Sequence, residues 1–460
     1  MSDQAAISRN PATGEDIQRF AFQDVAAVGQ LLADADRAFR AWRDVPVGRR
    51  AAVYGRLAAI MRERRDAVAA VITAEMGKTL KEAAAEIEKC AATAAWFGEH
   101  GPAMLADEPV GVEGDDQVHV SYLPIGTVLG IMPWNFPFWQ TIRAAVPIML
   151  SGNGFMLKHA PNVMACAYLM QEMWEQAGLP HGVFSVLNVG TDAIEAVIAD
   201  RRIAAVTLTG SMRAGAAVAA IAGKHLKKSV LELGGADPFI VLADADIEQA
   251  VKFAIAGRFA NAGQVCLAAK RLILEAPIAE RFTTLFLDAV RGIKAGDPTD
   301  EASTIGPIAR ADLRDGVHDQ VARSVAAGAR LLAGGHMIDG PGFFYEPTVL
   351  GDVTPGMAAF DEEVFGPVAA LVLARDTEHA IELANASDYG LSGNLWTADT
   401  GKAARIARRL ETGGVFINGF TASNPRTPVG GVKNSGYGRE LSHFGIREFV
   451  NAQTVWTRAG

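Results

Sequence analysis

Cysteine is scarce in this chain, which has only three in 460 residues: Cys90, Cys166 and Cys266. None of them forms a Cys-x-x-Cys pair, so the spacing excludes a disulfide framework and is typical of a reducing compartment. Residues 1–10 are polar and lack the apolar core of an export signal. We therefore expect a cytoplasmic protein. No group of histidine, cysteine and acidic residues has ligand spacing, and no metal is expected.

Basic residues are outnumbered: 43 lysines and arginines stand against 52 aspartates and glutamates, a net charge of −9. This balance gives no electrostatic footprint for nucleic acid or for an anionic membrane. The most apolar stretch, residues 127–157, contains Pro133, Pro137, Pro147 and Arg143. Such a segment is not expected to cross a bilayer, and we interpret it as buried interior. The expected partner is a small molecule.

Half of the residues are hydrophobic and 21% are charged, which is ordinary for a soluble globular enzyme. At 460 residues the chain exceeds what one hydrophobic core usually serves, so two or three domains are expected. No tandem repeat or low-complexity tract is present. Helical periodicity is predicted first, over residues 26–42, 49–73 and 79–97.

Short apolar runs then alternate with helices, which predicts a parallel sheet with right-handed crossovers. Strands are expected at 119–123, 127–132, 154–158, 184–189 and 204–209, and helices at 139–149, 163–177 and 192–198. A second alternation predicts a second α/β domain that carries Cys266. Its elements are expected at 239–242, 247–260, 271–274, 279–293, 364–373 and 391–396. Residues 334–355, rich in glycine and proline, are expected on the surface, and residues 441–455 as a strand that pairs with another sheet, on this subunit or another.

A thiol and a carboxylate stand in two glycine-bearing segments. Cys266 ends the run Asn261-Ala262-Gly263-Gln264-Val265-Cys266, and Glu232 lies in Leu231-Glu232-Leu233-Gly234-Gly235. A free thiol, with a pKa of about 8.5, is mostly protonated at neutral pH. A nearby carboxylate can take its proton, or activate the water that later releases an acyl group. The alternative is that Cys266 is a small buried hydrophobe, which is how we interpret Cys90 and Cys166.

The run Pro133-Trp134-Asn135-Phe136-Pro137 places a side-chain amide between two prolines. A fixed N–H donor is what an oxyanion formed from an aldehyde requires, and losing one typically costs about 3 kcal/mol of transition-state stabilisation. A purely structural Pro-Trp loop is the alternative.

Three further segments suit a dinucleotide. The predicted strand 204–209 leads into Thr209-Gly210-Ser211 and a helix, a turn where backbone amides can approach a phosphate, although the Gly-x-Gly-x-x-Gly spacing is missing. Lys158 ends the strand that starts at Gly154. The acidic run Asp361-Glu362-Glu363 precedes Val364-Phe365-Gly366-Pro367, so a carboxylate and an aromatic ring are available for a ribose and a flat base. An ordinary turn, a solvated lysine and a solvated acidic surface are the alternatives.

Taken in order, these motifs resemble those of the NAD(P)-dependent aldehyde dehydrogenase superfamily over nearly the whole chain, together with Gly430-Gly431-Val432-Lys433 and Ser435-Gly436-Tyr437-Gly438-Arg439-Glu440. The resemblance implies an α/β fold with two Rossmann-like parallel-sheet domains and a small β oligomerisation domain. It implies Cys266 as nucleophile, Glu232 as general base, and Asn135 with the Cys266 N–H as oxyanion hole. Glu440 matches a position linked to proton relay. The implied cofactor contacts are Met132, Pro133, Trp134, Lys158, Pro161, Gly210, Ser211, Gly215, Leu233, Glu363 and Phe365.

The same resemblance implies a dinucleotide-binding domain of residues 1–117 and 136–231 and a catalytic domain of residues 232–430. The oligomerisation arm would comprise residues 118–135 and 431–460, in a homodimer or homotetramer. NAD-preferring members often carry a glutamate three positions after the ribose lysine, where this chain has Pro161. Without that carboxylate, and with Lys158 and His159 nearby, NADP is expected to be accepted alongside NAD.

Residues 158–163 and 440–445 are most similar to bacterial succinate-semialdehyde dehydrogenases of the short, NAD(P)-using type. Arg143 stands where such enzymes use an arginine for the distal carboxylate; a second arginine that some of them use is replaced by Ala260. We expect Arg143, Arg426 and Trp139 to contact the substrate. Arg143 as a packing cation remains an alternative, as does a broad-specificity aliphatic, amino- or aromatic-aldehyde dehydrogenase. A noncatalytic relative is disfavoured because Cys266, Glu232 and Asn135 are all present.

Overall fold

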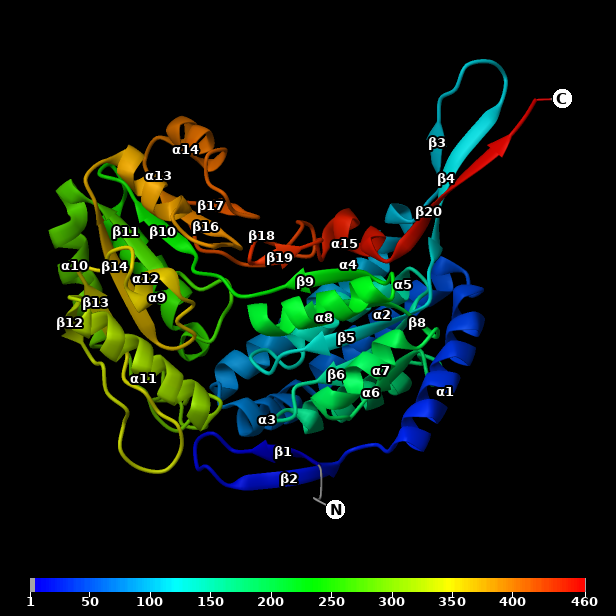
Figure 1. The fold of residues 1–460 in the computed structure, drawn as a ribbon, viewed down its shortest axis with the longest axis horizontal. Coiled ribbons are helices and arrows are strands. Elements are labelled where there is room, and N and C mark those ends of the chain that lie inside the picture. Colours follow the sequence, from blue (N-terminus) through cyan, green and yellow to red (C-terminus); the bar gives the residue numbers. More distant parts are fainter. Residues whose placement is uncertain (1–4, 460) are drawn as a thin grey trace.

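Two largely parallel sheets, each covered by helices, make up most of the molecule (Figure 1). The computed structural model describes residues 5–459. In spatial order, the strands of the six-stranded sheet are β19 (Gly436–Tyr437), β9 (Lys228–Glu232), β8 (Ile203–Thr209), β5 (Thr127–Met132), β6 (Gly154–His159) and β7 (Phe184–Val186). Those of the seven-stranded sheet are β12 (Arg330–Ala333), β13 (Thr348–Gly351), β14 (Val368–Ala374), β11 (Arg271–Glu275), β10 (Pro238–Val241), β16 (Gly393–Trp396) and β17 (Val415–Ile417).

Within these two sheets, β19 and β12 are the strands that run antiparallel to their neighbours, and both lie at an edge. The other pairs are parallel, as the predicted alternation of strands and helices requires. The six-stranded sheet carries α1 (Val25–Arg43), α5 (Trp139–Leu150), α6 (Met164–Gln176), a short turn η1 (Thr191–Ala193), α7 (Ile194–Ala199) and α8 (Met212–Lys224). The seven-stranded part contains α9 (Ile247–Phe259), η2 (Ala260–Gly263), α10 (Ala276–Val290), α11 (Ala311–Ala326), α12 (Ala358–Asp361), α13 (Thr377–Asn385) and α14 (Thr400–Ala407).

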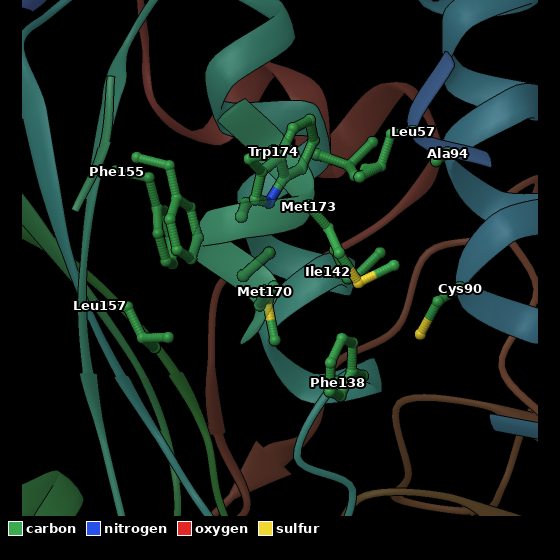
Figure 2. Close-up of a cluster of buried hydrophobic side chains, with 14 of the residues drawn as sticks. Leu57, Cys90, Ala94, Phe138, Ile142, Phe155, Leu157, Met170, Met173 and Trp174 are labelled. Atoms are coloured by element: carbon green, nitrogen blue, oxygen red, sulfur yellow. The ribbon is translucent and has the colours of Figure 1, made fainter. Parts of the chain in front are cut away.

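A helical layer of α2 (Val47–Glu63), α3 (Arg65–Met76) and α4 (Leu80–Met104) packs beside α5 and α6. Its contact with them is the larger hydrophobic core, in which Cys90 of α4 lies near Phe138 and Ile142 (Figure 2). Cys90 and Cys166 are both fully buried, which confirms their interpretation as packing residues. The predicted single helix 49–73 is two helices, because the chain turns at Arg64 between α2 and α3.

A three-stranded antiparallel sheet projects from the body (Figure 1). It consists of β3 (Glu108–Val110), β4 (Gln117–Pro124) and β20 (Val450–Thr457), and β20 pairs with β4 of the same chain. The predicted oligomerisation arm includes residues that do not belong to this sheet, since β5 lies at the centre of the six-stranded sheet and β19 at its edge. The predicted tail strand is likewise shorter: residues 442–448 form helix α15 (Ser442–Glu448) before β20 begins.

The smaller elements are two antiparallel strand pairs, β1 (Ala5–Arg9) with β2 (Asp16–Ala21) and β15 (Tyr389–Gly390) with β18 (Val432–Lys433). The interval 334–355 is partly in the sheet, because it includes β13. Within residues 5–459, no helix combines the length and the apolar character that crossing a bilayer requires.

Candidate active site

The loop that carries Asn135 connects β5 to α5 and is fixed from two sides. On one side, the ring of buried His159 lies 3.0 Å from the Pro137 carbonyl through Nε2 and accepts the Ala160 N–H at Nδ1. Burial lowers the pKa of His159 to about 4, so the ring is neutral at physiological pH. The expectation that His159 assists a 2′-phosphate is therefore not supported, because the side chain faces the protein interior and braces this loop.

On the other side, α4 provides a carboxylate. Glu86 Oε1 accepts the N–H groups of Phe138 and Trp139, each at 2.9 Å, and so caps the start of α5. Its Oε2 accepts a hydrogen bond of 2.6 Å from Lys78, and neither side chain of this pair is exposed. The Lys78 ammonium also lies 3.6 Å from the centre of the Phe136 ring. The Lys78–Glu86 ion pair thus holds the residues that directly follow Asn135 in place.

The loop before Cys266 is strained. Asn261, Ala262 and Gly263 all have left-handed backbones, with φ of 53°, 51° and 73°. Only glycine takes that conformation without cost, and a Cβ at Gly263 would lie 2.1 Å from the Gly366 carbonyl oxygen. The strain is held in place by Glu82. One of its oxygens completes the capping box of α4 with Thr79, and the other accepts the Asn261 N–H at 2.6 Å.

The two loops are also bonded directly to each other. The Asn261 side chain donates to the Asn135 carbonyl at 2.9 Å, and the Asn135 side chain donates to the Gln264 carbonyl at 3.0 Å. One N–H of the Asn135 side-chain amide is therefore bonded to the carbonyl of Gln264, two residues before Cys266. The other N–H is available to a ligand. Asn135 and Cys266 line the same cavity, as the sequence predicted.

This cavity has a volume of about 210 Å³ and lies between the two sheets. Of the predicted cofactor residues, those on its wall are Pro133, Trp134, Gly210, Ser211, Leu233, Glu363 and Phe365. Met132, Lys158, Pro161 and Gly215 are not on it. Met132 is buried, and Gly215 is needed for packing, since a Cβ there would lie 2.6 Å from Leu233. Lys158 lies near the carboxyl end of β6 and exposed Pro161 follows that strand, so both are at the same end of the sheet as the β8–α8 turn.

Lys270 was missed by the sequence analysis. Its ammonium donates to the Cys266 carbonyl at 2.6 Å and to Glu363 Oε1 at 2.9 Å. Glu363 Oε1 also accepts the Gly235 N–H at 3.1 Å. Lys270 thus connects the backbone of Cys266 to the carboxylate predicted to hold a ribose. Its position four residues after Cys266 is the only signal in the sequence.

A buried charge cluster lies beside Cys266. Arg143 of α5 forms an ion pair with Glu440, and its Nη2 is 3.7 Å from Glu232 Oε2 at the end of β9. Burial raises the pKa of Glu232 to about 8, against the opposing charge of Arg143 and with a contribution from Glu440. Burial also raises the pKa of Glu440. Two carboxylates around one guanidinium favour the retention of a proton in the cluster.

This arrangement argues against the predicted substrate contact of Arg143. The side chain is 1% exposed, is not on the wall of the cavity, and is already neutralised by two carboxylates. Trp139, one turn earlier on α5, is buried beneath Lys89, whose Nζ lies 4.1 Å from the ring centre. Arg426 is exposed and lies over Trp96, with 5.8 Å between its guanidinium carbon and the ring centre.

The sequence matches the model of the aldehyde dehydrogenase family over residues 2–455. The chain belongs to the aldehyde dehydrogenase family. It is 54% identical over 451 residues to succinate semialdehyde dehydrogenase (NAD(P)+) Sad of Escherichia coli, covering 98% of this chain and 97% of that protein. It is 47% identical over 450 residues to succinate-semialdehyde dehydrogenase (NADP(+)) of Mycobacterium avium, covering 97% of this chain and 95% of that protein.

The crystal structure of succinic semialdehyde dehydrogenase from Streptococcus pyogenes in complex with NADP+ superimposes with a TM-score of 0.96 at 37% identity, covering 98% of this chain and 99% of that one. Gox0499 superimposes with a TM-score of 0.97 at 40% identity, covering 99% of this chain and 100% of that one. The predicted family, the α/β fold class and the enzyme class, an aldehyde dehydrogenase, are thereby confirmed.

Cys266 should be the one cysteine that a small alkylating reagent labels, because Cys90 and Cys166 are fully buried. Burial raises the pKa of Cys266 to about 11, although Arg143 and Lys270 lower it. Since the thiolate is the reactive form, the labelling rate of the cofactor-free enzyme should still rise above pH 9. Lys270→Met should slow labelling at pH 9, whereas Lys252→Met, at an exposed site, should not. Mass spectrometry against pH measures this, and a plateau near pH 7 would contradict it.

Proposed function

We infer that the protein oxidises succinate semialdehyde to succinate with NAD(P)+, through a thioester on Cys266. The observation that carries the chemistry is the shared cavity, in which Cys266 and Asn135 face the β8–α8 turn, Glu363 and Phe365. The choice of aldehyde rests on the similarity to the two succinate-semialdehyde dehydrogenases described above and on the cations near the site. Glu232 is the expected general base.

The chain's residues suit a nicotinamide dinucleotide. Gly210 and Ser211 lie at the amino end of α8, where free backbone N–H groups favour a pyrophosphate, and a Cβ at Gly210 would find space. Lys158 has no acceptor for its ammonium among residues 5–459, and burial lowers its pKa. Ribose hydroxyls would supply that acceptor, and Glu363 would hold the second ribose. When bound, the nicotinamide ring accepts the hydride from the substrate carbon.

In the acylation half, Cys266 Sγ forms a bond to the aldehyde carbon and the carbonyl oxygen becomes an oxyanion. The free N–H of the Asn135 amide and the Cys266 N–H hold that charge. The thiol must first lose its proton. Burial opposes this by raising the pKa of Cys266 to about 11, whereas the charges of Arg143 and Lys270 favour the thiolate.

After hydride loss the acyl group remains on Cys266 as a thioester. Glu232 takes a proton from water, the resulting hydroxide attacks the acyl carbon, and the C–S bond breaks to give the carboxylic acid and the Cys266 thiolate; the acid then loses its proton and leaves as the carboxylate. Arg143 and Glu440 surround Glu232 and set its proton affinity. Arg143 therefore has a positioning and electrostatic role in this scheme.

The projecting sheet supports association of subunits. Val110, Leu123 and Trp456 expose apolar side chains on β3, β4 and β20. We infer a homodimer or homotetramer that buries this arm, working in the cytoplasm, where the three thiols stay reduced.

Glu232→Gln should accumulate a succinyl thioester when the enzyme is mixed with succinate semialdehyde and cofactor, because water is no longer activated. Intact-mass spectrometry measures the adduct, and Cys266→Ala, which lacks the sulfur, is the control.

The wild-type enzyme should also show a higher kcat/KM for succinate semialdehyde than for butyraldehyde, which has the same chain length without the carboxylate. Turnover by Cys266→Ala, or equal kcat/KM values, would contradict the chemistry or the substrate respectively.

NADP should be used alongside NAD, because the residue after Lys158-His159-Ala160 is Pro161 and not a carboxylate that would repel a 2′-phosphate. We expect the kcat/KM values for the two cofactors to differ by less than about a thousandfold, or some 4 kcal/mol. Pro161→Glu should shift the ratio toward NAD, whereas Pro341→Glu, at a distant exposed site, should not. A wild-type preference for NAD above a thousandfold would contradict the expectation.

A further inference from the structure

Lys89 is a cation on helix α4 that has no ionic partner within residues 5–459. It lies on the face of α4 that also carries Glu82 and Glu86, seven and three residues earlier, as one helical face requires. Its Nζ donates to Ser423 Oγ at 2.7 Å and lies 4.1 Å from the centre of the Trp139 ring. Glu86 is already engaged by Lys78 and two backbone N–H groups. Within residues 5–459, no carboxylate forms an ion pair with Lys89.

An ammonium partly removed from water, with only a hydroxyl and an aromatic face around it, is stabilised by a bound anion. Burial lowers the pKa of Lys89 to about 8, and the charge of Arg143 lowers it further, while those of Cys90, Glu86 and Cys266 raise it. Arg143 differs, because Glu440 and Glu232 already balance its charge.

The surroundings of Lys89 form a second wall beside Cys266. Ser423 lines a small cavity of about 40 Å³ together with Leu267, the residue after Cys266, and with Thr421 and Val429. Cofactor-side residues such as Gly210, Ser211 and Phe365 line the other cavity. Because the dinucleotide would occupy the cofactor-side cavity, we place the chain of an aldehyde bonded to Cys266 on the side of Leu267 and Ser423.

We propose that Lys89, seated on Trp139 and hydrogen-bonded to Ser423, binds the distal carboxylate of the substrate and selects short aldehydes that end in a carboxylate. The proposal rests on the proposed function, because it names the group that makes succinate semialdehyde preferred over butyraldehyde. Arg426, exposed over Trp96, adds a second positive charge nearer the solvent. The role predicted for Arg143 thus passes to Lys89.

The test compares Lys89→Met with wild type on two aldehydes of equal length, succinate semialdehyde and butyraldehyde. Methionine keeps the length and the packing on Trp139 but removes the charge. Loss of one charge-assisted hydrogen bond should raise KM for succinate semialdehyde by about 10- to 100-fold, and leave kcat/KM for butyraldehyde within about twofold. Lys81→Met, at an exposed position on the same helix, is the matched control and should change neither. Retained butyraldehyde turnover shows that the variant is folded.

A second measurement separates this proposal from the proposed function. Glutarate should inhibit butyraldehyde oxidation by the wild-type enzyme more strongly than butyrate does, and Lys89→Met should abolish the difference. If the wild-type enzyme does not prefer succinate semialdehyde, the proposed substrate fails, and glutarate inhibition that depends on Lys89 still supports the anion site. If the wild-type enzyme is selective but Lys89→Met affects both aldehydes equally or neither, Lys89 is not the determinant and the proposed function stands. Absence of both selectivity and inhibition overturns both.

The pH dependence gives a further readout. Since the pKa of Lys89 is about 8 in the free enzyme, the ratio of kcat/KM for succinate semialdehyde to that for butyraldehyde should fall as the pH rises above 8. Proton transfers in the chemical steps on Cys266 are common to both aldehydes, so their pH dependence cancels in the ratio. In Lys89→Met the ratio should be flat. A wild-type ratio that is constant between pH 7 and 10 would overturn the assignment.

Discussion

The active site depends on two carboxylates of one helix, Glu86, which is buried, and Glu82, which is partly exposed. Glu82 holds the strained loop before Cys266 through the Asn261 N–H, and Glu86 holds the start of α5, directly after the Asn135 loop. The two loops come from different sheets, and the loop before Cys266 contains successive left-handed residues that need support from outside the loop. Helix α4 is the common support that brings the nucleophile and the amide donor to one cavity. Asn261 and Asn135 then complete the connection.

Three groups of charged side chains lie around the site, and each has a different role. Lys270 binds the Cys266 carbonyl and Glu363 on the cofactor side. Arg143, Glu232 and Glu440 form a buried cluster in which burial raises the pKa of both carboxyls. Among the residues that the structure describes, no carboxylate pairs with Lys89, which donates to Ser423. The first two groups are internally paired, so they hold geometry and protons, whereas an unpaired cation is suited to a ligand.

Much of this was predictable from the sequence. The alternation of apolar strands with helices gave both sheets, and the family motifs placed Cys266 and Asn135 in one cavity. The partner of Arg143 was not predictable, because helical spacing places it one turn after Trp139 but does not tell which distant carboxylate folds against it. Helix α15 was missed because it has only seven residues. The charges of Glu82, Glu86 and Lys89 at helical spacing in an alanine-rich stretch were visible, and only the fold shows that they face the active site.

A double-mutant cycle on Glu82 and Glu86 tests the central claim most directly. Glu82→Gln, Glu86→Gln and the double variant would be compared by kcat for butyraldehyde, with Glu88→Gln, at an exposed site on α4, as the control. If the helix fixes both loops for one shared function, each single change should cost nearly as much as both together, since misplacing either loop separates Cys266 from Asn135. Additive effects on the free energy of activation, or single variants with wild-type kcat, would contradict the account.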